Sequence, residues 1–273
     1  MYRKIWKECH SSICSIYFLS KAGTRITTFT GFRIRDYLIT DDVITKTERP
    51  EKVHLKFTCE DGYTEKAGKT IAFKAFRERI LSPGDNNMPG YTILRLDDKE
   101  FSNIPSLKCA RRINYEIGHP VAILGHHDDQ NNLAIKAGII SSFFTLQDGL
   151  NYIQVDSSIQ QGNAGAPVIE PENLEVIGVI GHHMASVARS YRNIMNIINQ
   201  NLAILNEVVG KYSFDDVDPV QALIANQSQI KLVVKEFFKS TDMRVGFAVE
   251  LCNLIDYCPD LESASDFEVK AEE

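Results

Sequence analysis

The 273-residue sequence contains no apolar run near the roughly 18 residues that a membrane-spanning helix requires. It also lacks a segment typical of a secretion signal, because Cys, His and Ser interrupt the early apolar stretch and no small-residue cleavage site follows it. Its six cysteines are scattered and include no CxxC pair, a pattern that favours reduced thiols over a disulfide framework. These absences predict a cytoplasmic protein whose first residues belong to the mature sequence.

An excess of basic residues is absent as well. The formal net charge is −6, and neutralising phosphates requires clustered Lys and Arg, so nucleic acid is not expected to be the main partner. With 44% hydrophobic and 24% charged residues, the composition is that of a globular protein with a sizeable core. We expect one domain or a closely joined pair, no membrane contact and no cofactor.

Short β-rich segments separated by turn residues dominate both halves of the chain. Such segments, with almost no helical pattern between them, predict an all-β sandwich or a pair of barrels. The predicted strands are Ile13 to Phe18, Thr24 to Ile34, Tyr37 to Ile44, Val53 to Phe57, Thr70 to Phe76, Tyr91 to Leu96, Pro120 to Leu124, Leu133 to Ser141, Tyr152 to Val155, Val168 to Ile169 and Val176 to Ile180.

The stretch from Tyr152 to Ile180 carries the most specific local pattern. A strand runs into a loop marked by Gly162, Asn163 and Gly165, and two apolar strands follow. A loop of this kind turns several backbone N–H groups toward one point. In a suitable fold that point is an oxyanion hole, which stabilises the charge that develops on a scissile carbonyl.

This loop, GNAGAP from Gly162 to Pro167, resembles the GNSGGP loop that carries the nucleophile of trypsin-like serine proteases, and the stretch around it is most similar to the HtrA-like branch. Three further segments are similar to motifs of that family, in the same order: GFRIRDYLITDDVI at 31–44, GYTILRL at 90–96 and GIIS at 138–141. The resemblance implies a trypsin-like fold of two six-stranded β-barrels.

The same resemblance assigns the three catalytic positions of the family, and none carries the expected residue. The catalytic histidine falls on Asp42, the aspartate on Gly90 and the serine on Ala164. A methyl group cannot attack a carbonyl. A lone Ser-to-Ala change would suggest an engineered knock-out, whereas three losses together are typical of natural decay, because the three residues act as a unit. A pseudoprotease is therefore the favoured interpretation.

A helical pattern follows the last predicted strand. Apolar residues recur every three or four positions from Ile194 to Val209 and again from Leu223 to Phe237, with a break near Gly210 to Asp218. This predicts a helical hairpin, 188–210 and 218–240. Val245 to Val249 resembles the family strand that closes the second barrel. The predicted organisation is an N-terminal barrel (1–110), a C-terminal barrel (111–260) interrupted by the hairpin (188–240), and an acidic tail (261–273), with Leu251 to Tyr257 as a closing helix.

Several candidate sites have competing interpretations. Gly162, Asn163 and Ala164 form either an oxyanion-loop remnant that binds a carbonyl or carboxylate, or a turn that only the fold requires. Ser158 would lie at the floor of an uncharged specificity pocket, with Gly181 as a further pocket remnant, or it is an ordinary loop serine.

The pairs His126–His127 and His182–His183, with Asp128 or Asp129, have the chemistry of a zinc site. Solvated loop histidines are favoured instead, so no metal is predicted. Asp41–Asp42 is likewise interpreted as a solvated strand end, not a carboxylate dyad.

The sequence thus supports three hypotheses of function. The first is a catalytically inactive protease homologue that binds a protein or peptide through the remnant cleft, the hairpin or both. The second is a working hydrolase that uses a cysteine or serine beside one of the four histidines. The third is a scaffold or oligomerisation module. For Phe237 and Phe238 internal packing is favoured over partner binding, and the oligomeric state is left open.

Overall fold

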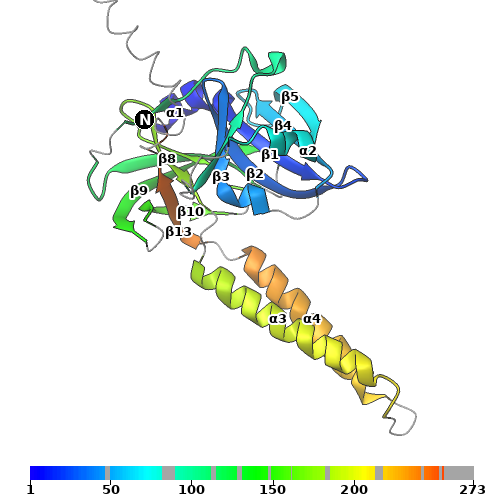
Figure 1. Ribbon diagram of the computed structural model, residues 1–273. Helices are drawn as coiled ribbons and strands as arrows, with labels where there is room; N and C mark the ends of the chain where they lie inside the picture. The colour runs from blue at the N-terminus through cyan, green and yellow to red at the C-terminus, as the bar shows by residue number, and fades with distance from the viewer. Residues whose placement is uncertain are drawn as a thin grey trace, which may run out of the picture. The chain divides into compact units, whose positions relative to one another are not determined.

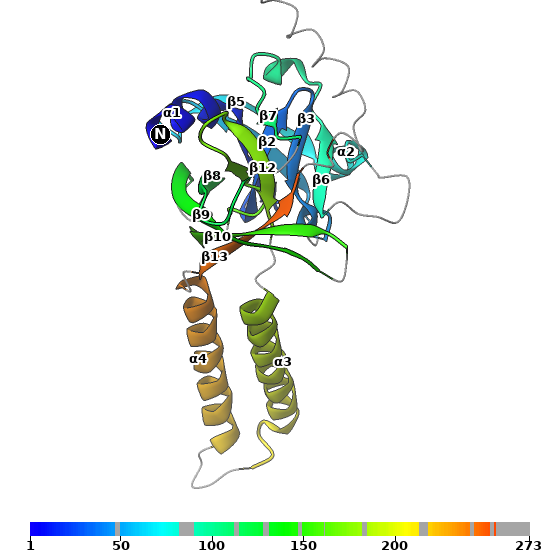
Figure 2. The ribbon, with the colours of Figure 1, turned by 90° about the vertical axis from the view of Figure 1, so that its left-hand side faces the viewer.

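The computed structural model describes residues 1–46, 50–81, 90–111, 115–127, 131–146, 149–160, 162–181, 185–212, 218–240, 243–251 and 254. It divides into a β-rich unit, formed by 1–182 and 243–273, and a helical unit, formed by 183–242. Figures 1 and 2 show the two sheets of the β-rich unit and the two long helices of the other.

The first sheet has six strands in the order β5-β4-β1-β2-β3-β6. Alternate residues of β1, Cys14, Ile16 and Phe18, point into one buried cluster with Leu38 and Phe57, as the two-residue period of a strand requires. The strands are β1 (Ile13–Leu19), β2 (Arg25–Ile34), β3 (Tyr37–Asp41), β4 (Lys52–Thr58), β5 (Glu65–Ala72) and β6 (Tyr91–Arg95).

The second sheet closes into a barrel, because β11 pairs with both β8 and β12. Its order is β11-β8-β9-β10-β13-β12, and β7 adds to β12 as a short parallel strand. These strands are β7 (Lys108–Cys109), β8 (Pro120–His126), β9 (Leu133–Thr145), β10 (Asn151–Ile159), β11 (Pro167–Ile169), β12 (Glu175–Ile180) and β13 (Met243–Glu250). The predicted trypsin-like double barrel is confirmed, whereas the predicted boundary near residue 110 stays a prediction.

A core cluster shared by both sheets holds the barrels together. It contains Phe32 and Ile39 from the first sheet and Leu124 and Val249 from the second. Helix α1 (Tyr2–Cys9) adds the fully buried Ile5 to the same cluster. The sequence interpretation did not include this helix. The sequence indicates it only by the four-residue step from Ile5 to Cys9. In the structure these are the buried residues of the helix.

Two predicted strands end earlier than expected. The strand predicted to end at Ile44 stops at Asp41, and a 3-10 turn, η2 (Asp42–Lys46), follows. The side chain of Asp41 accepts a hydrogen bond from the backbone N–H of Val43 (2.6 Å), which turns the chain out of the strand. The segment predicted as a strand from Thr70 to Phe76 is the end of β5 followed by helix α2 (Phe73–Glu78), whose buried residue is Phe76.

The helical unit is an antiparallel hairpin of α3 (Ala185–Val208) and α4 (Pro219–Ser240). The two helices run side by side in both views (Figures 1 and 2). Helix α4 begins at a proline, and Asp218 caps it by accepting from the N–H of Val220 (2.8 Å). No helix among the described residues combines the length and apolar character that crossing a bilayer requires.

The hairpin connects two strands that are neighbours in the second barrel. Val179 of β12 lies opposite Val249 of β13, and Ile180 lies opposite Ala248. The predicted pairing of Val245 to Val249 beside Val176 to Ile180 is confirmed. Of the predicted closing helix, only Leu251 and Leu254 lie within the described residues, and both are buried. The predicted acidic tail lies outside the described residues.

Candidate functional site

Two of the three positions that the resemblance assigns lie at adjoining strand ends. The ladder between β3 and β6 ends with Asp41 opposite Tyr91. Asp42 and Gly90 are therefore the next residues on the two chains. The carboxylate of Asp41 is 1% exposed and caps the turn that begins at Asp42. The interpretation of Asp41–Asp42 as a solvated strand end is therefore wrong for Asp41, which is buried.

Gly90 could not accept an aspartate without strain. Its backbone φ is +77°, a region that L-residues with a side chain rarely adopt. A Cβ atom there would lie 2.7 Å from a methyl carbon of Leu150 and 3.1 to 3.2 Å from the methyl carbons of Val249. This position is adapted to a residue without a side chain.

The loop that carries Ala164 is hydrogen-bonded to the first barrel. Thr30 donates its backbone N–H to the carbonyl of Ala164 (2.9 Å) and its hydroxyl to the carbonyl of Gly162 (2.6 Å). Gly165 has a φ of +87°, and a Cβ atom on it would meet the carbonyl oxygen of Thr30 at 2.0 Å and the backbone nitrogen of Asp41 at 2.9 Å. The fold thus brings the loop against the strand end that precedes Asp42.

Asn163 holds the same loop from the inside. Its fully buried amide oxygen accepts from the backbone N–H of Gln160 (2.9 Å) and from Nζ of Lys136 (2.7 Å), while its amide nitrogen donates to the carbonyl of His126 (2.9 Å). The N–H groups of Gly162 and Ala164, on either side of it, have no hydrogen-bond acceptor among the described residues. The hydrogen bonds of the loop thus leave two of its backbone donors unused.

Lys136 is a residue that sequence reasoning missed. It lies opposite Ile123, a core residue of the second barrel, and its ammonium donates to the carbonyl of Ser158 (2.7 Å) as well as to Asn163. The sequence predicts an uncharged pocket floor at Ser158. In the structure the ammonium of Lys136 is bonded to the main chain of this residue. The available signal was a lone lysine in the otherwise apolar run LAIKAGII at 133–140.

The remaining pocket positions are closely packed. Ile159, next to Ser158, is buried, and a Cβ atom on Gly246 would lie 2.6 Å from its side chain. Gly181 donates its N–H to the carbonyl of Phe247 (2.9 Å), which joins the end of β12 to β13. The walls around Ser158 and Gly181 are therefore held by main-chain bonds and by the side chain of Ile159.

His126 is not a solvated loop histidine, and that prediction is wrong for this residue. Strand β8 extends two residues beyond its predicted end, so His126 lies within the strand and is fully buried. Neither ring nitrogen has a hydrogen-bond partner among the described residues. Burial lowers the pKa of the imidazole to about 3, with smaller contributions from Lys56 and His127. An imidazole of that pKa is neutral at pH 7 and a weak general base.

The other elements of the zinc hypothesis cannot be assembled from the described residues. His127 is half-buried, while His182, His183, Asp128 and Asp129 lie outside the described residues. Within the described part of the chain, no group of three or more His, Cys, Asp or Glu side chains has the arrangement of a metal site.

The described cysteines are free thiols: Cys9, Cys14, Cys59 and Cys109. Burial raises the pKa of Cys9 to about 11 and that of Cys109 to about 12, and it raises the pKa of Cys14 further still. A thiol must ionise to act as a nucleophile. These three are therefore unreactive at neutral pH. Cys252 and Cys258 lie outside the described residues.

A hydroxyl–imidazole pair does occur elsewhere. Oγ1 of Thr70 lies 2.9 Å from Nδ1 of His54, whose Nε2 lies 3.2 Å from Glu65. These residues are on β4 and β5, whereas the loop at Ala164 packs against β2 and β3. Thr70 and His54 are directly opposite in the ladder, and the group is exposed. A cross-strand polar pair accounts for the arrangement.

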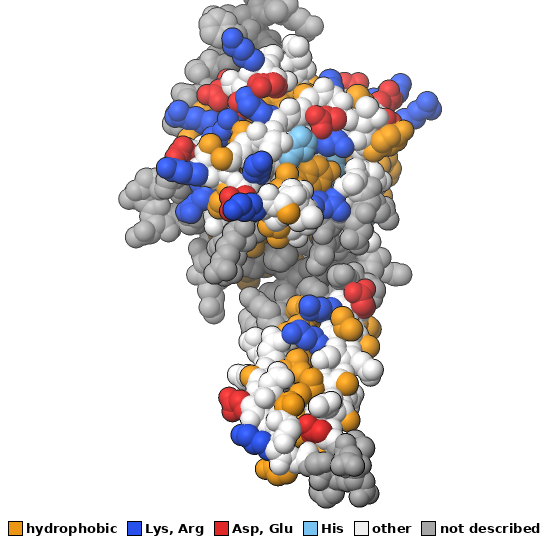
Figure 3. Space-filling view, turned by 90° about the vertical axis from the view of Figure 1, so that its right-hand side faces the viewer, with side chains coloured by type: hydrophobic (Ala, Val, Ile, Leu, Met, Phe, Trp, Pro, Cys, Tyr) orange, Lys and Arg blue, Asp and Glu red, His pale blue; other side chains and the backbone are white. Residues whose placement is uncertain are grey.

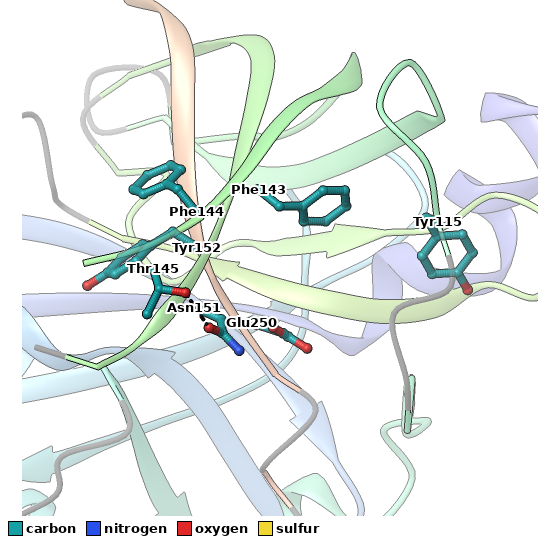
Figure 4. Close-up of a pocket in the computed structure, with 7 residues that line it drawn as sticks. All are labelled: Tyr115, Phe143, Phe144, Thr145, Asn151, Tyr152 and Glu250. Carbon is teal, nitrogen blue, oxygen red and sulfur yellow. Dashed lines mark hydrogen bonds between the residues drawn. The ribbon is translucent and has the colours of Figure 1, made fainter. Parts of the chain in front are cut away.

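A separate pocket of about 360 Å³ lies on the second barrel (Figure 4). Phe143 and Tyr115 face each other across it, and Asn151, which accepts a hydrogen bond from Thr145 (2.9 Å), lies beside Glu250. Phe144 and Tyr152 complete the lining. None of the predicted site residues lines this pocket, so it is distinct from the loop at Gly162 to Gly165.

The comparison with known families assigns the chain to one of them. The model of the trypsin-like peptidase domain matches residues 29–179, more than half of the 273-residue chain, so the chain belongs to this family. No curated protein matches the chain.

Solved structures share the fold. One is Rv3671c from Mycobacterium tuberculosis H37Rv, in an inactive form with a serine-to-alanine substitution; the identity is 15%, the TM-score 0.51, and 95% of this chain and 91% of that chain are covered. Another is the HtrA-type protease AlgW with a tripeptide, at 18% identity and a TM-score of 0.50. That match covers 66% of this chain and 54% of AlgW, so this chain spans about half the length of that structure.

Proposed function

We propose that this chain is a catalytically inactive trypsin-like protease homologue that binds a protein or peptide. The observation that carries the proposal is Ala164, which stands where the family has its nucleophile and whose methyl group packs with the core of the first barrel. Asp42 and Gly90 stand where the base and its orienting acid belong. Without a nucleophile and a base, the covalent mechanism of the family has no first step.

The binding chemistry of the proposal rests on the loop itself. The N–H groups of Gly162 and Ala164 flank the rigid amide of Asn163 and are available as donors. Two unused backbone donors, one on each side of Asn163, suit a peptide carbonyl or a terminal carboxylate, which are partly negative or anionic acceptors. The ammonium of Lys136, against Asn163 and Ser158, adds positive potential behind the loop. A short acidic or carboxylate-ended peptide is the ligand that this arrangement favours.

The rival function, a hydrolase with a nucleophile outside the family pattern, has less support. It requires an ionisable nucleophile beside a basic imidazole in the cleft. The imidazole of His126 has a pKa near 3, and burial keeps the thiols of Cys9, Cys14 and Cys109 protonated. The scaffold hypothesis differs only in leaving the loop unoccupied, and a binding experiment separates it from the proposal.

The first test is hydrolysis. Casein and a mixed peptide library should stay intact after incubation with the purified full chain. Turnover that follows the protein peak on gel filtration, and that a substitution of a cleft Cys or His abolishes, would contradict the proposal and favour the rival function.

The second test is binding, with a library of peptides that have either free or amidated C-termini. We expect the carboxylate forms to bind better. Asn163→Asp puts a carboxylate beside the ammonium of Lys136, behind the loop, where it offsets the positive potential, and it should weaken binding of such peptides by about tenfold or more. Asn103→Asp changes the net charge identically at an exposed site and should leave affinity unchanged. Equal effects of the two variants would mean that the loop is not part of the binding site.

A further inference from the structure

The hairpin has a seam that joins its two helices. Ile198 of α3 is 4% exposed and Val220 of α4 is 6% exposed, and Leu202 and Leu205 continue the seam in steps of four and three residues. Lys231 of α4 donates to the side chain of Asn199 of α3 (2.8 Å), which sets these two residues level along the antiparallel pair. The pattern is that of helices packed along one apolar stripe each.

Each helix also has a second apolar stripe that this seam leaves exposed. On α3 it comprises Ile194, Ile197 and Ile204, which are 44%, 57% and 62% exposed. On α4 it comprises Leu223, Ile230 and Val233, which are 51%, 40% and 67% exposed. Within each stripe the residues are three and seven positions apart, which keeps them on one side of a helix. Figure 3 shows hydrophobic side chains recurring along the hairpin.

The two exposed stripes lie on the same side of the hairpin. At 3.6 residues per turn, each stripe is rotated by roughly a quarter turn from the buried seam of its own helix, in the same sense along the chain. Because the helices are antiparallel, equal rotations bring both stripes to one face. Ile197 and Val233, each two residues from the Asn199–Lys231 bond, are level across it. We call these six residues the second face.

The charge pattern narrows the choice of what covers the second face. No Asp, Glu, Lys or Arg occurs in 193–206 of α3 or in 219–230 of α4, and the charged residues nearest Val233 are Lys235, Glu236 and Lys231, the last of which bonds Asn199. A surface without clustered Lys and Arg gives little attraction to nucleic acid or to an anionic membrane surface. A partner must itself be apolar and uncharged there. A second copy of the hairpin meets that condition without like-charge repulsion.

The shape of the second face also suits a second hairpin. A helix with two apolar seams about 100° apart has two helical neighbours, which is the arrangement in a four-helix bundle. Each stripe contains one Asn at its middle, Asn201 on α3 and Asn226 on α4, and a polar residue of this kind specifies register in such packings. The six residues extend over about 20 Å of the hairpin, and together with the side chains that flank them a face two helices wide buries roughly 500 Å² per copy, or about 1,000 Å² in total, the lower limit for a specific interface.

We infer that two copies of this chain associate through their hairpins, second face against second face, to form a four-helix bundle. This goes beyond the proposed ligand binding and does not depend on it, because no residue of the second face belongs to the loop at Gly162 to Gly165. The expected product is a homodimer in which each copy presents its own candidate site.

The test is the mass of the full chain in solution, measured by sedimentation between about 1 and 100 µM, the range in which a 1,000 Å² interface is expected to associate. The wild type should sediment as twice the 30.8 kDa chain. Val233→Glu should weaken the dimer by about a hundredfold or more, because a carboxylate would be buried without a partner.

Leu232→Glu is the matched control. Leu232 is 62% exposed and adjacent to Val233, but successive helix residues are about 100° apart, and Leu232 lies on the other side of the buried seam from the second face. This variant should remain a dimer. Far-ultraviolet circular dichroism checks that both variants fold, and Ile197→Glu on α3 replaces Val233→Glu if the latter does not.

Three results would overturn the inference. The first is a wild type that is monomeric throughout the concentration range. The second is equal weakening by Leu232→Glu and Val233→Glu. The third is a dimer that survives removal of residues 185–240, because its contacts would then lie on the barrels.

Discussion

Ala164 lacks the hydroxyl of the family's nucleophile, and both its carbonyl and its methyl group are in contact with the first barrel. Its carbonyl is bound by Thr30, and its methyl group packs with the core of the first barrel. Restoring a serine would return an oxygen atom but not its activation. Within the described part of the chain, the place of the base is held by Asp42, which begins a turn.

We therefore predict that Ala164→Ser has no measurable hydrolytic activity and does not react with a fluorophosphonate probe, which labels activated serines. A serine hydroxyl without a general base is a weak nucleophile at pH 7. The measurement is probe labelling followed by mass spectrometry, with an active trypsin-like protease as positive control. Stoichiometric labelling at position 164 would mean that a base exists that we have not identified.

The buried His126 lowers the stability of the folded chain only at acidic pH. Its pKa is about 3 in the folded chain against 6.5 in the reference state, so the unfolded chain binds the proton more readily below pH 6.5. The stability that the neutral ring contributes is fully present above pH 6.5 and is lost as the pH falls from 6.5 toward 3. Between pH 7 and pH 5 this loss amounts to about 2 kcal/mol.

Replacing His126 by Leu should remove that part of the pH dependence. The free energy of unfolding in urea, measured at pH 7 and pH 5, should fall about 2 kcal/mol less for His126→Leu than for the wild type. His54→Leu, which replaces a half-buried histidine of β4 in the same way, is the matched control. If the slope is unchanged in His126→Leu, other groups titrate in this range and His126 is not the cause.

At the scale of elements, the hairpin is an insertion between strands that already pair. Because Ile180 and Ala248 are opposite each other in the ladder of β12 and β13, a short connection can replace everything between them. The hairpin also has its own buried seam, with Ile198 near the middle of α3 and Val220 in the first turn of α4. Each unit thus has a core of its own.

We predict that replacing residues 185–240 by a short Gly-Ser linker leaves the barrels folded. The near-ultraviolet circular dichroism spectrum and a cooperative urea transition should persist, with a modest loss of stability from the longer loop closure. A noncooperative transition would mean that the hairpin contributes core surface to the barrels. If the deleted protein also keeps every binding partner of the full chain, the loop at Gly162 to Gly165 is the recognition element.

At the scale of the whole molecule, the candidate site is also a junction between the two barrels. The loop after β10 belongs to the second barrel, yet Thr30 and Thr40 of the first barrel surround its glycine. Gly165 is the closest point, because its φ of +87° and the atoms around it exclude a side chain. Packing of the barrels and geometry of the loop therefore depend on one another.

Gly165→Ala should destabilise the chain by about 3 kcal/mol, from backbone strain together with the overlap between the new methyl group and Thr30. Gly149→Ala is the control, because Gly149 has a similar φ of +78° with nothing within 4 Å of its added Cβ, and it should cost only about 1 kcal/mol. Urea denaturation at neutral pH measures both. Equal costs would mean that the junction relaxes to admit the methyl group.

The sequence by itself determined the features that arise from local pattern and fixed spacing. The short β-rich segments predict a sandwich or a pair of barrels, and the resemblance of the motifs selects the double barrel. The loop from Gly162 to Pro167 locates the candidate site, and the three- and four-residue period after Ile180 predicts the hairpin. Each of these signals lies within one short segment. The order of the motifs at 31–44, 90–96 and 162–167 adds the connection between them, because a shared order of motifs reflects a shared fold.

Only the tertiary structure decided which side chains meet. The ammonium of Lys136 reaches Asn163 and Ser158 because β9 pairs with β8 in one register, and a slip of one residue would turn it to the other face. His126 is buried because β8 runs on between the barrels, which no local pattern indicates. Contacts of this kind depend on pairings between segments distant in the chain. Their geometry therefore exists only once the barrels have closed.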